Sequence, residues 1–245
     1  MPAQRILYQF PISHYCEKAR WVLDHKQLEY RVYNQMPGPH MFINTLRTGK
    51  RTVPVLVEHG AAISGSHAIC LHLEASGAGP SLLPQTAAGR ALLDEIVAVF
   101  DEQVGPAVRR YAYGFLTVHA DLFNQVFFQG YAGGARVVGQ LLAPVLRREI
   151  ARMYRVHRDD NRASPDLMRR AADMVEGRLR DGSRYLIDDR LSLADITVAS
   201  LLAPMTGPRG SPWTFEPEIP ELQALRAELR QRPIGAYIAE LYASR

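Results

Sequence analysis

The chain has 245 residues, of which 47% are hydrophobic and 22% charged, a formal net charge of +4 and two cysteines. This length allows one large or two small domains, and the mild positive charge favours anionic small molecules without calling for nucleic acid. No apolar run reaches the roughly 20 residues of a membrane helix, and the N-terminus is too short and polar for a signal peptide. Cys16 and Cys70 exclude a disulfide framework and lack the spacing of zinc ligands. We therefore expect a cytoplasmic protein with no metal, no nucleic-acid partner and no membrane partner.

The N-terminal elements alternate between strand and helix. Residues 5–10 are a short β-rich run and predict a strand. Ser13 follows, and residues 17–24 place their apolar side chains on one face of a helix. Residues 28–34 alternate in polarity and predict a second strand, whereas residues 36–51 are rich in Pro and Gly and predict a loop. The chain therefore begins with the order β-α-β.

A proline interrupts the next apolar run. Residues 52–58 are β-branched and apolar, but Pro54 cannot donate a hydrogen bond to a ladder. This predicts either an edge strand or a strand entered through a cis X-Pro bond, and the sequence leaves both open. The run 59–64 predicts a turn and a short strand. Ser64 or Ser66 then caps a helix over 67–75, which completes an α/β unit too small for a doubly wound nucleotide domain.

The composition and the hydrophobic periodicity of the sequence change after residue 77. The stretch 78–89 continues a run of Gly, Pro and small residues and predicts a linker. Beyond it, apolar residues recur at helical spacing over 92–108 and 137–153, and no strand pattern is found. We therefore predict an α/β domain over residues 1–77 and an all-α domain over residues 90–245.

Three further helix signals support the all-α assignment. Ser164 followed by Pro165 marks a helix start. Ser192 and Asp195 form a variant of the capping box, with aspartate in place of the usual glutamate. Residues 220–245 predict one or two helices divided near a proline.

Ser13 stands where the first strand meets the first helix. Such a junction presents backbone N–H groups and the positive end of a helix dipole, which stabilise an anion such as a thiolate. A serine hydroxyl placed there can also donate to the sulfur. The alternative is that Ser13 only caps the helix, a role worth about 1 kcal/mol.

Two other segments suit a peptide-like ligand. If the Val53–Pro54 bond is cis, the backbone of Val53 is free to pair with a ligand as an added strand; the alternative is a trans proline on an edge strand. Within Gly65-Ser66-His67 a strand turns into a helix, so Ser66 either binds a carboxylate or simply caps the helix. Together with Ser13, these segments would suit an acidic peptide that carries a thiol.

Four stretches carry a resemblance to a known family: SHYCEKARWVLD, TVPVLVEHGAAISGSHAICLHLE, RYLIDDRLSLADITVAS and FEPEIPELQALRAELRQRPI. In this order and over nearly its full length, the chain resembles the cytosolic glutathione transferases with a serine-type active site. The resemblance implies a thioredoxin-like N-terminal domain, an all-helical C-terminal domain, a homodimer and a role in detoxification. Glutathione would lie along the first domain, with a small electrophile in the cleft beside the first helices of the second.

The resemblance also implies roles for individual residues. Ser13 would stabilise the glutathione thiolate, while Cys16 falls where redox relatives keep a second, buried cysteine. Val53 would hold the cysteinyl backbone beside a cis Pro54. The other implied glutathione contacts are His40, Lys50 and Arg51 for the glycine carboxylate, and Gly65, Ser66 and His67 for the γ-glutamyl group.

Three side chains are expected around the second substrate, namely His14, Arg109 and Tyr113. His14 replaces the family's usual proline, and because neighbouring helical residues point about 100° apart, we do not expect it to form a serine–histidine pair with Ser13. We expect His14 to face solvent or the ligand. Arg109 and Tyr113 either bind the electrophile or pack within their helix region, and Cys70 is expected to be a buried structural thiol.

The main hypothesis is a glutathione S-transferase that activates the glutathione thiol for attack on a small hydrophobic electrophile. A second hypothesis is a glutathione-dependent thiol–disulfide oxidoreductase or isomerase that works through Cys16. A third is a non-catalytic protein of the same fold, suggested by Gly65, which stands where an acidic or amide residue is common, and by His14.

Overall fold

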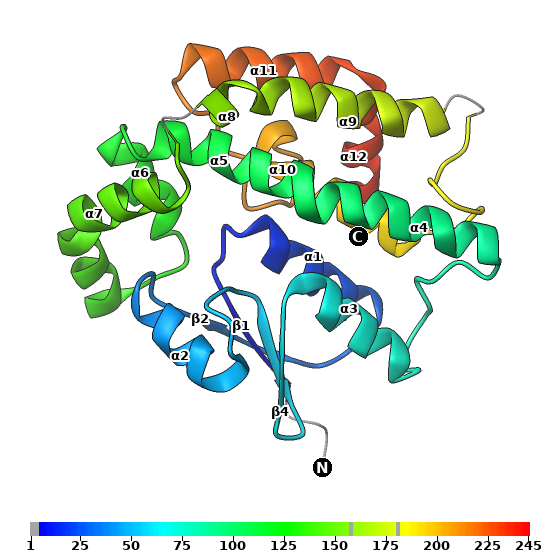
Figure 1. The fold of residues 1–245 in the computed structure, drawn as a ribbon, viewed down its shortest axis with the longest axis horizontal. Helices are drawn as coiled ribbons and strands as arrows, with labels where there is room; N and C mark the ends of the chain where they lie inside the picture. The colour runs from blue at the N-terminus through cyan, green and yellow to red at the C-terminus, as the bar shows by residue number, and fades with distance from the viewer. Residues whose placement is uncertain (1–4, 157–158, 180–181) are drawn as a thin grey trace. The chain divides into compact units, whose positions relative to one another are not determined.

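The computed structural model describes residues 5–156, 159–179 and 182–245 (Figure 1). Its contacts divide the chain into two compact units, one of Met1–Ser81 with His119–Ile150 and one of Leu82–Val118 with Ala151–Arg245. The predicted fold class is confirmed, because a small mixed sheet with helices forms the N-terminal part and every described element after residue 64 is helical. The domain boundaries drawn from the sequence stay a prediction.

The sheet has four strands in the order β2-β1-β3-β4. The strands are β1 (Ile6–Gln9), β2 (Arg31–Asn34), β3 (Val55–Glu58) and β4 (Ala61–Ser64). β1 runs parallel to β2 and antiparallel to β3, which is antiparallel to β4. Because β3 is an interior strand, the edge-strand interpretation of Pro54 is wrong. The strand is instead entered through a cis Val53–Pro54 bond.

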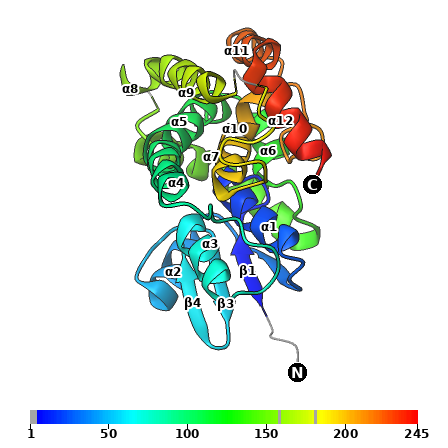
Figure 2. The same cartoon turned by 90° about the vertical axis from the view of Figure 1, so that its right-hand side faces the viewer.

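The two faces of the sheet carry different helices. Successive residues of a strand point to opposite faces. Tyr8 lies under the guanidinium of Arg47, 4.1 Å from its ring centre, and Gln9 accepts a hydrogen bond from Arg20. Arg47 belongs to α2 and Arg20 to α1, so these helices cover opposite faces. The helices are α1 (His14–His25), α2 (Pro39–Thr48) and α3 (Ser66–Ala75), and α3 packs against α1 (Figure 2).

Helix α2 corrects the loop predicted over residues 36–51. Pro39 occupies the first turn of the helix, where a missing N–H is tolerated, and Gly49 ends it in the left-handed conformation. The proline and glycines that suggested a loop are therefore the start and stop signals of a ten-residue helix.

The N-terminal unit also contains two consecutive helices from the middle of the chain. They are α6 (Ala120–Phe127) and α7 (Gly133–Met153), and the unit ends within α7 at Ile150. A Cβ built on Gly139 of α7 would lie 2.4 Å from the Phe128 ring, so only glycine allows this approach. The helix predicted over 137–153 is confirmed and begins four residues earlier.

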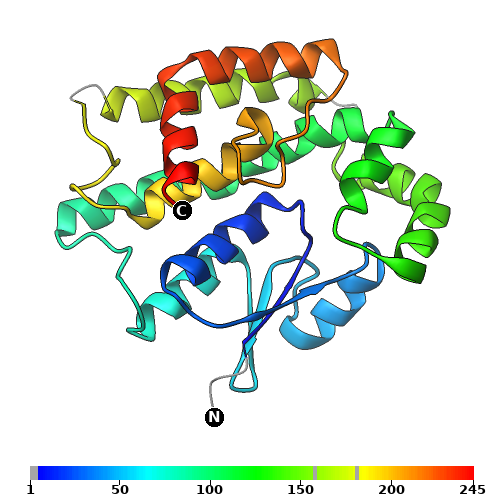
Figure 3. The ribbon, with the colours of Figure 1, turned by 180° about the vertical axis from the view of Figure 1, so that it is seen from behind.

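The second unit is all-helical in its described part. Helix α10 (Leu193–Thr206) is buried along its whole length and contacts α4, η1, α5, α11 and α12 (Figures 1 and 3). A helix that is apolar on every side must be surrounded by other elements. The others are α4 (Ala87–Val99), the π-helical segment η1 (Phe100–Val104), α5 (Gly105–Leu116), α8 (Asp159–Arg162), α9 (Ser164–Arg178), α11 (Pro220–Gln231) and α12 (Pro233–Ala243).

The predicted capping box at the start of α10 is confirmed. Ser192 and Asp195 bond each other's backbone N–H groups. One Asp195 oxygen accepts the Ser192 N–H at 2.7 Å, and the other accepts the Leu186 N–H at 2.8 Å and the Tyr237 hydroxyl. The carboxylate is fully buried, so these bonds replace its hydration. Asp195 is therefore a structural centre of the second unit.

Candidate functional site

Three predicted segments meet at one end of the sheet. The register pairs Tyr8 with Val55, so the chain leaving β1 toward Ser13 lies across from the chain that enters β3 through Val53. Val55 in turn pairs with Ser64 at the end of β4. The N–H of Gly65 then donates to the carbonyl of Pro54 at 3.0 Å, which fixes the start of α3 beside the cis bond. The N-terminal unit thus brings Ser13, Val53 and Ser66 to the same end of its sheet.

Ser13 is the N-cap of α1. Its hydroxyl oxygen accepts the Cys16 N–H at 3.3 Å, and its carbonyl accepts the Glu17 N–H at 2.8 Å. The capping interpretation is therefore confirmed. The cap does not exclude the second interpretation, in which Ser13 donates to a thiolate. A serine hydroxyl can accept one hydrogen bond and donate another, so the Ser13 O–H is able to donate to a sulfur atom.

His14 is the first residue of α1 and is only 4% exposed, so the expectation that it faces solvent is wrong. Its ring lies 4.6 Å from the ring of Tyr15. A contact with the second substrate stays a prediction.

Helix α3 begins without a side-chain cap. Its N-cap is Gly65, with φ 99° and ψ 137°, and Ser66 is the first helical residue, so the prediction that Ser64 or Ser66 caps the helix is wrong. A positive φ of this size favours glycine, which explains why no acidic or amide residue precedes Ser66. The Ser66 hydroxyl forms no hydrogen bond within the described part of the chain. This uncapped start fits an anionic group such as a carboxylate.

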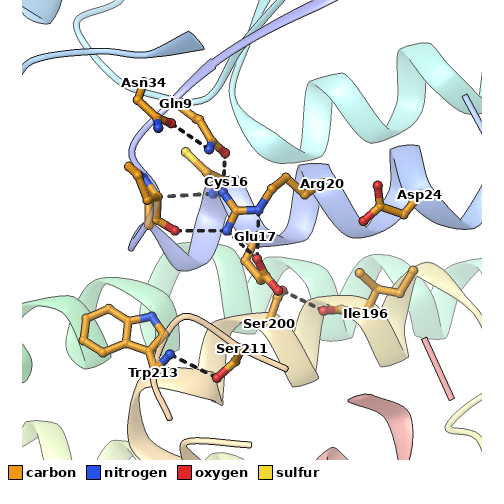
Figure 4. Close-up of polar contacts among 12 residues, drawn as sticks. Gln9, Cys16, Glu17, Arg20, Asp24, Asn34, Ile196, Ser200, Ser211 and Trp213 are labelled. Atoms are coloured by element: carbon orange, nitrogen blue, oxygen red, sulfur yellow. Dashed lines mark hydrogen bonds and ion pairs between the residues drawn. The ribbon is translucent and has the colours of Figure 1, made fainter. Parts of the chain in front are cut away.

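Arg20 organises a polar cluster with Gln9 and Glu17 (Figure 4). Its guanidinium donates to the Pro11 carbonyl at 3.1 Å, to the Gln9 side-chain oxygen and to the Glu17 carboxylate. Gln9 and Glu17 are each less than 5% exposed. These bonds hold the loop between β1 and α1 against the strand, so Arg20 fixes the backbone that carries Ser13.

Cys16 lies in this cluster and is fully buried, as expected. Burial raises the pKa of its thiol, and the positive charge of Arg20 and a hydrogen bond from Ser13 only partly offset that effect. A buried, protonated thiol is a poor nucleophile. Cys70, also fully buried, agrees with its predicted structural role.

A second polar chain leads from the connection between α6 and α7 toward Val53. The Tyr131 hydroxyl donates to the Gln35 carbonyl, and the side chains of Gln35 and Asn44 exchange two hydrogen bonds of 2.9 Å. Asn44 also donates to the Thr52 carbonyl at 3.1 Å, one residue before Val53. Gln35 and Asn44 are 2% and 0% exposed. We call Tyr131, Gln35, Asn44 and Thr52 the Tyr131 relay.

The residue before Tyr131 also contacts the Ser13 loop. Gly130 has φ 79°, and a Cβ built on it would lie 3.1 Å from the Pro11 ring. Its carbonyl accepts the Asn34 amide at 3.4 Å, and Asn34 accepts the Gln9 amide at 3.0 Å. The connection between α6 and α7 therefore touches the supports of both Ser13 and Val53.

The three residues predicted to bind the glycine carboxylate have different surroundings, since His40 is packed against other side chains and Lys50 and Arg51 are exposed. His40 on α2 packs its ring 4.6 Å from that of Phe10, and its Nδ1 accepts the Gly38 N–H at 3.2 Å. Burial lowers the pKa of His40 to about 4, so the ring is neutral at neutral pH. Lys50 and Arg51 are exposed cations that follow the end of α2.

The two residues predicted for the electrophile lie in the second unit and share one aromatic partner. Arg109 stacks over the ring of Tyr154 at 4.6 Å, and Tyr113 meets the same ring edge-on at 5.0 Å. Both come from α5, where residues four apart lie on one face. This arrangement is a half-buried aromatic and cationic surface, and both interpretations of Arg109 and Tyr113 stay open.

The residues that hold the backbone beside Ser13 and Val53 were not predicted from the sequence. Gln9 within an apolar strand was an available signal, because a buried polar residue usually marks a hydrogen-bonded network. Arg20 gave no such signal, since it lies among other charged residues of α1. Tyr131 gave no signal, since its partner is 96 positions away. Among the described residues, no group of three His, Cys, Asp or Glu is placed to hold a metal ion, and no helix is long and apolar enough to span a membrane.

Comparison with known proteins matches two family models. A model described as the N-terminal domain of glutathione S-transferase matches residues 7–81, and one for the C-terminal domain matches residues 149–233. Residues 82–148, which include the α6 helix and most of α7, lie outside both ranges. No curated protein matched the chain.

Solved structures similar to the chain span nearly its full length. A glutathione S-transferase from Rhodospirillum rubrum F11 is 25% identical, with a TM-score of 0.58 and coverage of 96% of this chain and 91% of that one. The β-etherase LigF from Sphingobium sp. strain SYK-6 is 20% identical, with a TM-score of 0.56 and coverage of 97% and 99%. A glutathione S-transferase from Methylobacillus flagellatus KT with glutathione bound is 18% identical, with a TM-score of 0.52 and coverage of 96% and 99%.

Proposed function

Since the chain belongs to the glutathione S-transferase family, we propose that it binds glutathione and activates its thiol for attack on a small hydrophobic electrophile. The observation that carries this proposal is the meeting of Ser13, Val53 and Ser66 at one end of the sheet, beside a hydroxyl that can donate and an uncapped helix start. We further propose a cytoplasmic homodimer with a role in detoxification.

Each part of glutathione has a matching group. Its γ-glutamyl carboxylate suits the start of α3 at Ser66, where the helix dipole favours an anion. Its cysteinyl backbone suits Val53, which lies outside the strands and joins no backbone hydrogen bond among the described residues. Its glycine carboxylate suits Lys50 or Arg51 as a counter-ion, whereas neutral His40 contributes only a hydrogen bond.

Ser13 is the residue that activates the glutathione thiol. Its oxygen accepts the Cys16 N–H, and rotation about its C–O bond lets the O–H turn toward the sulfur of a bound thiol. A hydrogen bond to the thiolate, together with the α1 dipole, lowers the pKa of the thiol toward neutrality. The activated thiol supplies the nucleophile, and a contact of the electrophile with Arg109 and Tyr113 stays a prediction.

The thiol–disulfide alternative has less support. It needs a reactive Cys16, but this side chain is fully buried and the pKa of its thiol is raised. The non-catalytic alternative depends on weak glutathione binding, and Gly65 does remove one side-chain contact from the ligand.

Two measurements on the full-length protein test the proposal. Titration calorimetry with glutathione should detect binding at millimolar ligand, and conjugation of a generic aromatic halide should fall about ten-fold or more in Ser13→Ala. Calorimetry without heat would favour the non-catalytic alternative, and unchanged turnover in Ser13→Ala would remove Ser13 from the mechanism. If Cys16→Ser abolished turnover instead, the oxidoreductase alternative would hold.

A further inference from the structure

The turn that carries Ser13 is held by a side chain of α1. The Ser13 N–H donates to the Phe10 carbonyl at 3.1 Å, which closes a turn over residues 10–13 with Pro11 at its second position. The Pro11 carbonyl accepts the Arg20 guanidinium at 3.1 Å. Arg20 therefore binds the turn itself, two residues before the hydroxyl that is proposed to activate the thiol. We call residues 10–13 the Ser13 turn.

Two side-chain amides link Arg20 to a backbone carbonyl outside the sheet (Figure 4). The Gln9 oxygen accepts the Arg20 guanidinium, and the Gln9 nitrogen donates to the Asn34 oxygen at 3.0 Å. The Asn34 nitrogen donates in turn to the Gly130 carbonyl at 3.4 Å. Each link donates in the same direction, from Arg20 toward Gly130. We call Arg20, Gln9, Asn34 and Gly130 the Asn34 network.

The two ends of the Asn34 network determine how its amides are turned. A guanidinium only donates and a carbonyl only accepts, whereas a side-chain amide has one atom of each kind. The ends therefore permit one arrangement of Gln9 and Asn34. Without Asn34, the nitrogen of Gln9 would lose its acceptor, and water would not replace it readily because Gln9 is 4% exposed. Gln9 would then have to move, and Arg20 would lose a fixed acceptor.

Gly130 also limits the Ser13 turn from outside. A Cβ built on Gly130 would lie 3.1 Å from the Pro11 ring, so the glycine lets the two segments approach closely. Gly130 lies between the two ranges that the family models match, which end at residue 81 and resume at residue 149. The contact is therefore a feature of this chain that membership of the family does not imply.

The charge of Arg20 reaches the start of α1. Burial raises the pKa of the Cys16 thiol, and the positive charge of Arg20 is the largest effect that opposes this rise. The same charge would favour the thiolate of a ligand beside the Ser13 hydroxyl, since an opposite charge nearby stabilises an anion. The position of Arg20 therefore affects both the Ser13 turn and the electrostatic potential around it.

We propose that Asn34 is a positioning residue for thiol activation, which holds the Ser13 turn in place through Gln9 and Arg20. This role rests on the proposed function, in which the Ser13 hydroxyl donates to the glutathione thiolate. It differs from the role of the Tyr131 relay, which ends beside Val53 and so acts on the binding of the cysteinyl backbone. Loss of Asn34 should therefore lower kcat, whereas loss of the Tyr131 hydrogen bond should raise KM.

Kinetics of Asn34→Leu in the full-length protein test this role, because leucine is similar in size and forms neither hydrogen bond. With glutathione and a generic aromatic halide, kcat at neutral pH should fall about three- to ten-fold. The lower limb of the turnover–pH profile should move to higher pH, and KM for glutathione should stay nearly unchanged. Thr45→Val is the matched control, since it removes an exposed hydrogen bond to the Met41 carbonyl within α2 of the same unit. The control should keep both kcat and the pH profile.

Amide hydrogen exchange tests the structural step without a substrate. In Asn34→Leu, residues 10–17 should exchange faster than in the unchanged protein and in Thr45→Val, because the Ser13 turn is held less firmly. Gly130→Ala gives a second test, since its Cβ would press on the Pro11 ring. Combined with Asn34→Leu, it should lower kcat by less than the product of the two single effects, because both changes act on one turn. Circular dichroism and thermal melting show whether each variant is folded.

Two results in a protein that binds glutathione would overturn the role of Asn34 alone. One is hydrogen exchange over residues 10–17 that does not differ between Asn34→Leu and Thr45→Val. The other is faster exchange in Asn34→Leu while kcat and the pH profile match those of the control. If calorimetry shows instead that the unchanged protein does not bind glutathione, the proposed function fails, and with it the catalytic role of Asn34.

Discussion

The hydroxyl oxygen of Ser13 lies 3.3 Å from the backbone nitrogen of Cys16 and accepts its hydrogen bond. This bond fixes the oxygen at the start of α1, and the hydroxyl proton can turn either to the buried Cys16 thiol or to the sulfur of a ligand. One residue therefore caps a helix and presents a donor at the positive end of its dipole. The two roles proposed for Ser13 can be separated by experiment, because stability reports the cap and pH dependence reports the donor.

Ser13→Ala should lower the free energy of unfolding by about 1 kcal/mol through the lost cap. It should also move the lower limb of the turnover–pH profile to higher pH, because the bound thiol loses a donor. Thr86→Ala is the matched control, since Thr86 caps α4 by accepting the Gly89 N–H at 3.0 Å. That control should lose similar stability and keep the pH profile. A profile that shifts equally in both variants would mean that Ser13 acts only through the fold.

Cys16 and Cys70 should both resist thiol reagents in the native protein and react fully after unfolding. Both side chains are fully buried, and burial raises the pKa of the Cys16 thiol so that little thiolate is present at neutral pH. Titration with an aromatic disulfide reagent, with and without denaturant, measures this. Rapid reaction of Cys16 in the native protein, with Cys70→Ser used to assign the signal, would contradict the prediction.

Tyr131→Phe should weaken glutathione binding more than it changes kcat. The variant keeps the ring but removes the donor to the Gln35 carbonyl at the head of the Tyr131 relay, which ends beside Val53. A lost hydrogen bond of about 1 kcal/mol corresponds to a roughly three- to ten-fold rise in KM for glutathione.

Tyr30→Phe is the matched control for the Tyr131 relay. It removes a tyrosine hydrogen bond to Asp24 in the same unit, and that bond is exposed. Its KM for glutathione should stay unchanged. Equal effects in the two variants, or a fall in kcat alone for Tyr131→Phe, would show that the relay does not position Val53.

His40 should make the protein sensitive to mild acid. Burial lowers the pKa of His40 to about 4, below the ordinary value of 6.5, so the unfolded chain binds the proton more readily. Stability from this residue is therefore complete above about pH 6.5 and is lost as the pH falls toward 4, by up to roughly 3 kcal/mol. In urea titrations at several pH values, His40→Gln should show a shallower loss over this window. Parallel pH dependence of the two proteins would contradict the assignment.

Asp195→Asn should destabilise the second unit by about 2–4 kcal/mol. The amide cannot accept all the bonds that the carboxylate takes from Ser192, Leu186 and Tyr237, and it would leave buried donors unpaired. Asp166→Asn is the control, because Asp166 forms an exposed ion pair with Arg169 and should cost less than about 1 kcal/mol. Denaturant unfolding monitored by circular dichroism compares the two. Equal losses would show that the capping box is not a folding centre.

Local sequence determined most of the elements. Strands, helix starts and caps depend on residues within a few positions of one another, and Ser13, Pro165, Ser192 and Asp195 marked their elements correctly. The loop predicted at α2 failed for a local reason, because Pro39 and Gly49 occur equally well at the two ends of a helix as in a loop.

Only the tertiary structure decided how these elements support the candidate site. The Val53–Pro54 isomer, the inward position of His14 and the Tyr131 relay depend on contacts between residues far apart in the chain. The same holds for α7, whose apolar spacing predicted a helix but not which side would be covered. A periodic pattern fixes the side chains that share a face, whereas the packing of Gly139 against Phe128 decides that the aliphatic face is left exposed.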